Sequence, residues 1–291
     1  MESKIKVSVC ISTYNQQDTI KQCVISILNQ VTDYDFEIIV GDDCSTDKTP
    51  NILKELSLEY PSRLKLLLSE VNKGPSENYV AIHQSARGEY ICHLDGDDFA
   101  LADKLQKCST FLDQNPNIGV LFHRMKLLYP DGSIKEDCAN PEKMGQSTFT
   151  QKDILAIGCI GAHSSRMYRS KLRLETYPRV FLDYYVDVMQ TENFNAYVLS
   201  DILGGYRVGV GISSASDFTK KLYISHLKYF FETMKDKRKY ILVNILTQFL
   251  IRLKKRFVDY DLLRACCHKD IFLSCCLFFK YLKFRFYFRL P

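Results

Sequence analysis

Short apolar runs alternate with amphipathic segments along the first 130 residues of the chain. Apolar runs predict strands at residues 5–11, 36–40, 64–68, 90–94 and 120–127. Apolar positions at helical spacing predict helices at residues 18–29, 48–60, 76–85 and 103–115. A series of strands and helices in this order predicts an α/β fold, in which helices flank a mainly parallel, Rossmann-like sheet.

The remainder of the chain divides into a mixed segment and a helical one. Residues 130–162 lose the alternation and predict a connecting segment that leads to a helix at residues 150–157. From residue 220 onward the pattern is helical, with basic residues among Phe, Tyr, Leu and Ile. We therefore expect one domain over residues 1–219 and a basic, aromatic-rich helical region over residues 220–291.

The net charge of +5 conceals an asymmetry between these two regions. Residues 220–291 contain 17 Lys and Arg against 5 Asp and Glu, a net charge of +12, whereas residues 1–219 carry a net charge of −7. No uncharged apolar run reaches the roughly 20 residues that a membrane-spanning helix needs. The N-terminus also lacks a signal-like apolar segment. We expect a cytoplasmic protein that does not span the membrane.

The eleven cysteines indicate neither disulfides nor a metal–thiolate site. Their number is odd and no Cys-x-x-Cys pair occurs, whereas zinc sites and disulfide-rich domains use paired cysteines at regular spacing. We expect reduced thiols, most of them in the core.

Three polar clusters follow three of the predicted strands. They are residues 12–15 (STYN), residues 41–47 (GDDCSTD) and residues 95–98 (DGDD). The carboxyl ends of parallel strands meet at one edge of a sheet, where such proteins bind ligands. At least five carboxylates of these clusters would then share a small volume, and their mutual repulsion favours a divalent cation. Oxygen ligands of this kind predict Mg²⁺ or Mn²⁺.

The order and spacing of these clusters resemble glycosyltransferase family 2, whose members have the GT-A fold. The family has a first-strand motif similar to STYN, a second motif similar to VDDxSTD followed by Thr, a later NxG, and a DxD motif written LDxDD. Here they correspond to residues 12–15, residues 41–47 with Thr49, residues 72–74 (NKG) and residues 95–98. The resemblance covers residues 5–215 and implies a domain that binds a nucleotide-sugar.

The resemblance implies a role for each matching residue. Tyr14 would stack on uracil, and Asp43 would accept a hydrogen bond from uracil N3–H. Asp95 would approach the ribose, while Asp97 and Asp98 would bind the Mn²⁺ or Mg²⁺ ion that bridges the diphosphate and acts as a Lewis acid. The expected nucleotide-sugar site comprises Thr13, Tyr14, Asn15, Asp43, Asn72, Gly74, Asp95, Asp97 and Arg207.

An inverting transfer also needs a general base for the acceptor hydroxyl. In the family this base is an Asp or Glu roughly two dozen residues before a YRxH-like motif. The chain offers Asp183, with Asp187 as the alternative, before Tyr206 and Arg207. Gly209 stands where the family has His, so Arg207 remains as the group that could face the diphosphate.

These assignments predict an inverting, metal-dependent glycosyltransferase. It would move a hexosyl or N-acetylhexosaminyl group from a UDP-sugar to a hydroxyl of a glycan or lipid-linked glycan in cell-surface polysaccharide synthesis. His163 is either a residue of the acceptor pocket or a buried structural histidine. Alternative functions are a nucleotidyltransferase and a catalytically inactive, membrane-associated scaffold. A nucleotidyltransferase usually has a Gly-rich, basic loop after its first strand, and residues 12–19 contain neither Gly nor a cation.

The basic region predicts peripheral association with the inner face of the cell membrane. Residues 237–239, 254–256 and 281–289 combine cations with aromatic and aliphatic residues, which favours anionic lipid surfaces. The alternative is a helical subdomain that packs on the catalytic domain with its cations in solvent. Nucleic acid is not an expected partner, because no recognisable nucleic-acid-binding module accompanies the charge.

Overall fold

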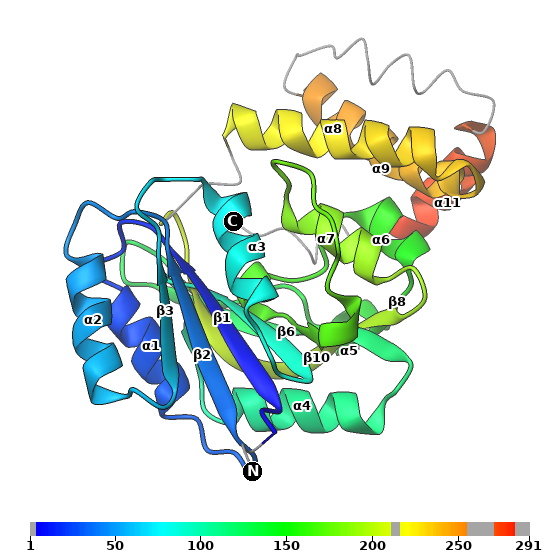
Figure 1. Cartoon of the computed structure of the whole chain (residues 1–291). Coiled ribbons are helices and arrows are strands. Elements are labelled where there is room, and N and C mark those ends of the chain that lie inside the picture. The colour runs from blue at the N-terminus through cyan, green and yellow to red at the C-terminus, as the bar shows by residue number, and fades with distance from the viewer. Residues whose placement is uncertain (1–3, 211–215, 255–270, 283–291) are drawn as a thin grey trace.

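The fold is built on one mixed β-sheet. A computed structural model describes residues 4–210, 216–254 and 271–282 (Figure 1). Four parallel strands form one half of the sheet, in the order β3 (Leu64–Leu68), β2 (Phe36–Asp42), β1 (Val7–Thr13) and β4 (Tyr90–Asp95). This half confirms the α/β fold that the alternating sequence pattern predicts.

The other half of the sheet includes strands that the sequence pattern does not predict. The order continues from β4 through β9 (Met167–Arg169), β6 (Ile118–Leu128) and β10 (Asn195–Arg207) to β5 (Phe99–Ala100). Short strands β7 (Ile134–Glu136) and β8 (Thr148–Phe149) pair with β6 and β10. Strand β9 is antiparallel to both β4 and β6, whereas β6 and β10 are parallel. Strands β4, β6 and β10 therefore all run toward the same edge of the sheet.

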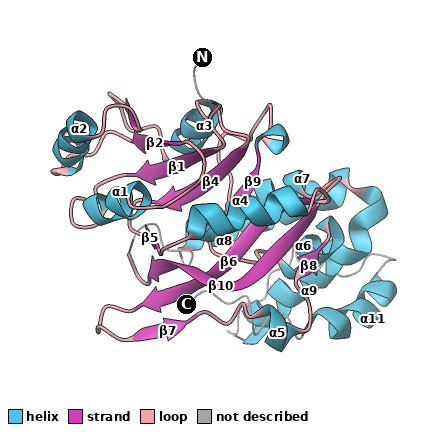
Figure 2. Ribbon diagram, turned by 90° about the horizontal axis from the view of Figure 1, so that it is seen from below, coloured by secondary structure: helices cyan, strands magenta, loops and turns pink. Residues whose placement is uncertain are grey.

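Helices cover both faces of the sheet and create two apolar cores. On one face lie α1 (Ile20–Leu28), α2 (Thr49–Glu59) and α4 (Lys104–Gln114). On the other face lie α3 (Pro75–Gln84), α6 (Gln151–Ile157) and α7 (Asp183–Gln190). Neighbouring residues of β1 such as Val9 and Cys10 belong to different cores, because side chains alternate along a strand. Figure 2 shows the sheet extending from the side of α2 to β7 at the opposite edge.

The remaining short elements complete the connections. They are α5 (Pro141–Met144) and the 3-10 helices η1 (His163–Ser165), η2 (Ser170–Leu172) and η3 (Lys235–Lys237). The predicted helix at residues 150–157 is present as α6, where Thr150 and Asp153 form a reciprocal capping box. Helix η1 lies beside β4, and its Ser164 Oγ accepts a hydrogen bond from Asp95 N at 2.9 Å.

Helices α8 (Asp217–Thr233), α9 (Arg238–Lys254) and α11 (Ile271–Leu282) pack against α6 and α7 (Figure 1). Phe230 of α8 is fully buried against the rings of Tyr184 and Tyr185. The Tyr281 hydroxyl donates a hydrogen bond to Asp153 Oδ1 at 2.8 Å, and Asn244 Nδ2 donates one to the carbonyl of Leu155. The described part of the basic region thus shares a core with residues of the preceding region.

The described helices include none that is long and apolar enough to cross a bilayer. Of the basic segments that the sequence singles out, residues 237–239 lie at the junction of η3 and α9. Residues 255, 256 and 283–289 lie outside the described part of the chain.

We expect Phe230→Ala to lower the free energy of unfolding by about 3 to 5 kcal/mol, because a fully buried ring is lost and a cavity remains. Phe218→Ala is the matched control on the same helix, since that ring is 64% exposed, and we expect its effect to stay within about 0.5 kcal/mol. Urea unfolding followed by circular dichroism measures both. A second, separate transition that alone responds to Phe230→Ala would show that the helices are an independent appendage.

Candidate functional site

Three strand ends meet at one edge of the sheet, in the arrangement that the polar clusters predict. The loop after β2 reaches β1 through a hydrogen bond from Asp43 N to Thr13 O of 3.1 Å. The loop after β4 reaches the same strand through a hydrogen bond from Gly96 N to Ser12 O of 2.9 Å. The three clusters therefore line one continuous edge.

Asp43 is buried and held by the loop that precedes α3. Its carboxylate accepts hydrogen bonds from Lys73 N and Gly74 N, each at 2.8 Å, and Asn72 Nδ2 donates to Asp43 O at 3.1 Å. Gly74 has a φ of 89°, which residues with a side chain rarely adopt. The carboxylate is thus fixed in one orientation, and its remaining lone pairs can accept a further hydrogen bond from a ring N–H.

The end of β1 offers one exposed ring beside this carboxylate. Tyr14 is 46% exposed, whereas Thr13 is buried. Asn15 instead links two loops, because its Oδ1 accepts a hydrogen bond from Thr46 N at 2.8 Å and its N donates to Ser45 Oγ at 2.8 Å. We conclude that Asn15 shapes the edge of the site through these contacts, while the ring of Tyr14 is available for stacking.

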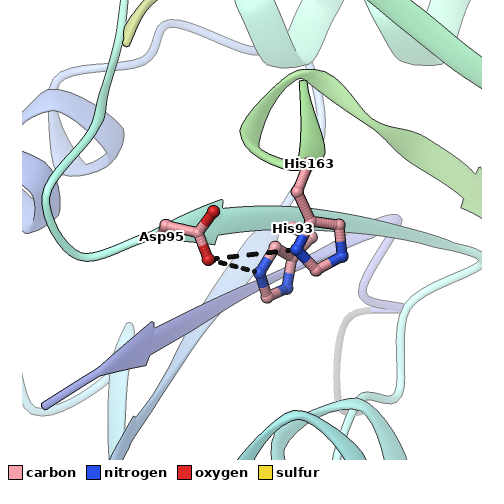
Figure 3. Close-up of side chains that lie close together, drawn as sticks. All are labelled: His93, Asp95 and His163. Carbon is pink, nitrogen blue, oxygen red and sulfur yellow. Dashed lines mark hydrogen bonds and ion pairs between the residues drawn. The ribbon is translucent and has the colours of Figure 1, made fainter. Parts of the chain in front are cut away.

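Asp95, the last residue of β4, lies beside His93 and His163 (Figure 3). His93 Nε2 lies 3.1 Å from its Oδ1, His163 Nδ1 lies 3.9 Å from the same oxygen, and Ser164 Oγ donates to its Oδ2 at 3.2 Å. Burial alone would raise the pKa of Asp95, but these neighbours lower the pKa well below its usual range. The ligand atoms of His93, Asp95 and His163 lie within 4.8 Å of one another, so this set could also hold a metal ion.

Asp97 and Asp98 are buried carboxylates in which burial and repulsion outweigh the groups that stabilise the charge. Burial and the charge of Asp95 raise the pKa of Asp97 to about 7, and burial with both other charges raises the pKa of Asp98 well above its usual range. Asp98 Oδ1 accepts a hydrogen bond from Arg207 N at 3.0 Å, but its buried Oδ2 has no hydrogen-bond partner among the described residues. An orphaned oxygen in a cluster of repelling acids fits a hard divalent cation such as Mg²⁺ or Mn²⁺.

Arg207 brings a cation to this pair from the end of β10. Its guanidinium donates hydrogen bonds to the carbonyl of Asp97 through Nη1 and to Gln22 Oε1 through Nη2. It also lies over the ring of Phe99, 5.3 Å from the centroid. The structure therefore joins Arg207 directly to the loop that carries the aspartates.

Asp183 begins α7 and contacts His163, which also lies near Asp95. Its Oδ1 lies 3.5 Å from His163 Nδ1, and 46% of its side chain is exposed. Partial burial, followed by the negative charge of Asp95, raises the pKa of Asp183 to about 6. An accessible carboxylate with a pKa in this range can take up a proton near neutral pH.

Asp187 lies one turn farther along α7, in a different environment. It is buried, and its Oδ1 lies 3.3 Å from Nη2 of Arg166, which is itself fully buried and also bonds Gln190. Burial raises the pKa of Asp187 to about 7, although the charge of Arg166 opposes this rise. Asp187 is therefore a buried partner of Arg166, whereas Asp183 is accessible to a ligand.

The sequence analysis did not single out several residues of this site. Arg166, His83, His93 and Tyr168 are all buried beside the predicted residues. Only His93 had a readable signal, because a residue two positions before Asp95 on a strand lies on the same face of the sheet. His163, which the sequence offered as acceptor-pocket or structural, contacts both Asp95 and Asp183.

Comparison with known proteins shows the family to which the chain belongs. The sequence profile of glycosyl transferase family 2 matches residues 8–174. This range includes Asp43, Asp95, Asp97 and Asp98 but ends before Asp183 and Arg207.

Two relatives are similar in sequence over about two thirds of the chain. The uncharacterized protein Rv1520 of Mycobacterium tuberculosis is 29% identical over 204 residues, which cover 69% of this chain and 58% of that protein. The chain therefore spans less than two thirds of the length of this relative. TuaG of Bacillus subtilis, whose name assigns it to teichuronic acid biosynthesis, is 28% identical over 204 residues, which cover 69% of this chain and 79% of TuaG.

Two solved structures share the fold. S. aureus TarS 1-349 in complex with UDP-GlcNAc superposes with a TM-score of 0.63 at 20% identity, covering 83% of this chain and 72% of that one. The mannosyltransferase PcManGT of Pyrobaculum calidifontis, in complex with GDP-Man and Mn²⁺, superposes with a TM-score of 0.60 at 15% identity, covering 98% and 84%. The likeness extends to the helices beyond the family match and shows that the fold is the GT-A fold.

Proposed function

Because the chain belongs to glycosyl transferase family 2, we propose that it transfers a sugar from a nucleotide-sugar to a hydroxyl of a glycan or lipid-linked glycan in polysaccharide synthesis. The observation that carries this proposal is the convergence of Asp43, Asp95, Asp97 and Asp98 at one sheet edge. The name of TuaG supports a polysaccharide product. Release of UDP from a UDP-sugar tests the proposal, whereas release of pyrophosphate from a nucleoside triphosphate would identify a nucleotidyltransferase.

A UDP-linked hexose or N-acetylhexosamine is the proposed donor. The fixed carboxylate of Asp43 can accept the uracil N3–H, and the exposed ring of Tyr14 can stack on the base. A base that presents an acceptor at this position would face the negative carboxylate, which disfavours its binding. The ribose hydroxyls would donate to Asp95. TarS is solved with UDP-GlcNAc, which supports a donor of this class.

Asp97 and Asp98 are the proposed ligands of Mn²⁺ or Mg²⁺. The unpartnered Oδ2 of Asp98 and the raised pKa values of both residues support this assignment. PcManGT is solved with Mn²⁺, which supports a metal in this fold. When bound, the ion would act as a Lewis acid that stabilises the diphosphate leaving group. Arg207, already joined to Asp97, would add its charge beside that group.

Asp183 is the proposed general base of an inverting transfer. Its carboxylate would accept the proton of the acceptor hydroxyl while the hydroxyl oxygen forms a bond to the anomeric carbon from the face opposite UDP. The bond between that carbon and the phosphate oxygen breaks, and its electron pair leaves with UDP. His163, in contact with Asp183, would border both the donor and the acceptor.

The basic helices are proposed to hold the enzyme at an anionic membrane surface. Exposed lysines of α8 and η3 supply charge on described residues, namely Lys220, Lys221, Lys228 and Lys235. Each cation near the headgroups contributes roughly 1 kcal/mol. Such association would bring the site to a lipid-linked acceptor.

We expect Asp97→Asn and Asp98→Asn each to weaken Mn²⁺-dependent UDP binding at least about tenfold, because each removes one ligand charge. Thermal stability should not fall, since each change keeps the side-chain volume and relieves repulsion between buried acids. Calorimetric titration of UDP with and without Mn²⁺ measures the effect, and exposed Asp236→Asn is the control. Wild-type metal dependence in both variants would exclude this metal site.

We expect Asp183→Asn to slow transfer at least about 100-fold while leaving UDP-sugar affinity unchanged, because a general base acts in the transition state. In the wild type, single-turnover transfer should fall as the pH drops through about 6, where Asp183 becomes protonated. Asp187→Asn is the matched comparison, and we expect reduced stability there because Arg166 loses its buried partner. Normal transfer by Asp183→Asn would reject it as the base.

We expect the full chain to sediment with phosphatidylserine-containing vesicles at low salt and to be released at high salt, because salt screens the lysine charges. Changing Lys220, Lys221, Lys228 and Lys235 together to Gln should weaken binding at least about tenfold. The matched control changes four exposed lysines elsewhere, Lys21, Lys54, Lys65 and Lys126, and should bind like the wild type. Failure of the intact chain to bind at low salt would refute membrane association.

A further inference from the structure

A buried chain of hydrogen bonds leads from the core to Asp95. The Tyr168 hydroxyl lies 2.7 Å from His83 Nδ1, His83 Nε2 lies 2.9 Å from His93 Nδ1, and His93 Nε2 lies 3.1 Å from Asp95 Oδ1. Tyr168, His83 and His93 are fully buried and come from β9, α3 and β4. Three elements that are far apart in sequence thus contribute to the environment of one carboxylate.

The carboxylate determines the direction of every hydrogen bond in this chain. An ionised Asp95 can only accept, so His93 Nε2 carries a proton, and in a neutral His93 ring Nδ1 is then an acceptor. His83 Nε2 must then donate to His93, which leaves His83 Nδ1 to accept from the Tyr168 hydroxyl. Burial and the neighbouring His93 lower the pKa of His83 well below its usual range, consistent with a neutral ring. With both histidine rings neutral, this arrangement matches every donor and acceptor in the series of hydrogen bonds.

Packing holds the rings of this chain in place. The His83 ring stacks on Tyr79 at 3.7 Å between centroids, and the His93 ring stacks on His163 at 3.9 Å. On the far side of the carboxylate, Ser164 Oγ donates to Asp95 Oδ2. Because 35% of the Asp95 side chain stays exposed, one edge of the fixed carboxylate remains open to a ligand.

We propose that His93 is a positioning residue that orients Asp95 to accept a ribose hydroxyl of the donor, with His83 and Tyr168 fixing the tautomer of His93. This inference rests on the proposed role of Asp95 in donor binding. It adds residues that lie outside the nucleotide-sugar site expected from the sequence and that do not themselves touch the donor.

The test compares the affinities of UDP, 2′-deoxy-UDP and 3′-deoxy-UDP in the presence of Mn²⁺. In the wild type we expect loss of the recognised hydroxyl to weaken binding roughly tenfold or more, as for a hydrogen bond to a charged group. In His93→Leu the ratio of the deoxy-UDP dissociation constant to that of UDP should fall toward one, because Asp95 is no longer oriented. His93→Gln keeps an amide donor near the position of Nε2, so it should restore part of the ratio.

Tyr168→Phe changes the residue at the other end of the series of hydrogen bonds, and it alters the side-chain volume less than His93→Leu does. Loss of the hydroxyl frees the tautomers of His83 and His93, so we expect a ratio between those of the wild type and His93→Leu. Tyr229→Phe, at a ring that is 45% exposed on α8, is the matched control and should keep the wild-type ratio. If His93→Leu fails to fold, Tyr168→Phe still measures the effect.

The possible outcomes distinguish failure of the positioning role of His93 from failure of the proposed donor binding. Equal weakening of UDP and its deoxy analogues in His93→Leu and Tyr168→Phe would mean a purely structural role and overturn the inference. A second Mn²⁺ or Zn²⁺ equivalent that His93→Gln loses and Asp97→Asn keeps would also overturn it, because His93 would then be a metal ligand. Absence of any UDP binding by the wild type would refute the proposed donor instead.

Discussion

Repulsion between acidic side chains at one edge of the sheet is the constraint on which the site depends. The protein handles the acids in different ways. Backbone N–H groups of the loop before α3 satisfy Asp43, and histidines with a serine keep Asp95 ionised. Burial, followed by repulsion from the neighbouring acids, raises the pKa values of Asp97 and Asp98, although hydrogen bonds and Arg207 oppose this rise. The same edge thus carries two acids whose charge is stabilised by hydrogen bonds and two acids whose charge a cation would stabilise.

The second acidic region depends on a buried ion pair. Asp187 pairs with Arg166 inside the protein, while Asp183, one turn earlier on α7, remains accessible. Helix α7 is further held by Phe230 of α8 against Tyr184 and Tyr185. The C-terminal helices therefore support the element that carries the proposed base, in addition to any contact they make with a membrane.

The sequence predicted the parts of the fold that local patterns encode. The strands β1, β2, β3, β4 and β6 and the helices between them follow from apolar periodicity, and the edge residues follow from polar clusters after strands. Strand β9 could not be predicted, because three residues ending in Arg169 carry no periodic signal. The histidine chain was also missed, since it forms only when His83, His93 and Tyr168 meet across three elements. Spacing favoured Asp183 over Asp187, but the sequence could not show that Asp187 is buried beside Arg166 while Asp183 is accessible beside His163.

Strand β9 joins the two halves of the sheet, and its middle residue is Tyr168. Only three residues pair with β4 and two with β6, so this seam has fewer ladder bonds than its neighbours. Because Tyr168 is also the first group of the chain that ends at Asp95, separation of the seam would disconnect that chain. By thermodynamic linkage, a donor that binds the oriented Asp95 also strengthens the cohesion between the two halves of the sheet. A change that weakens the contact between the two halves of the sheet would then also weaken the affinity for the donor.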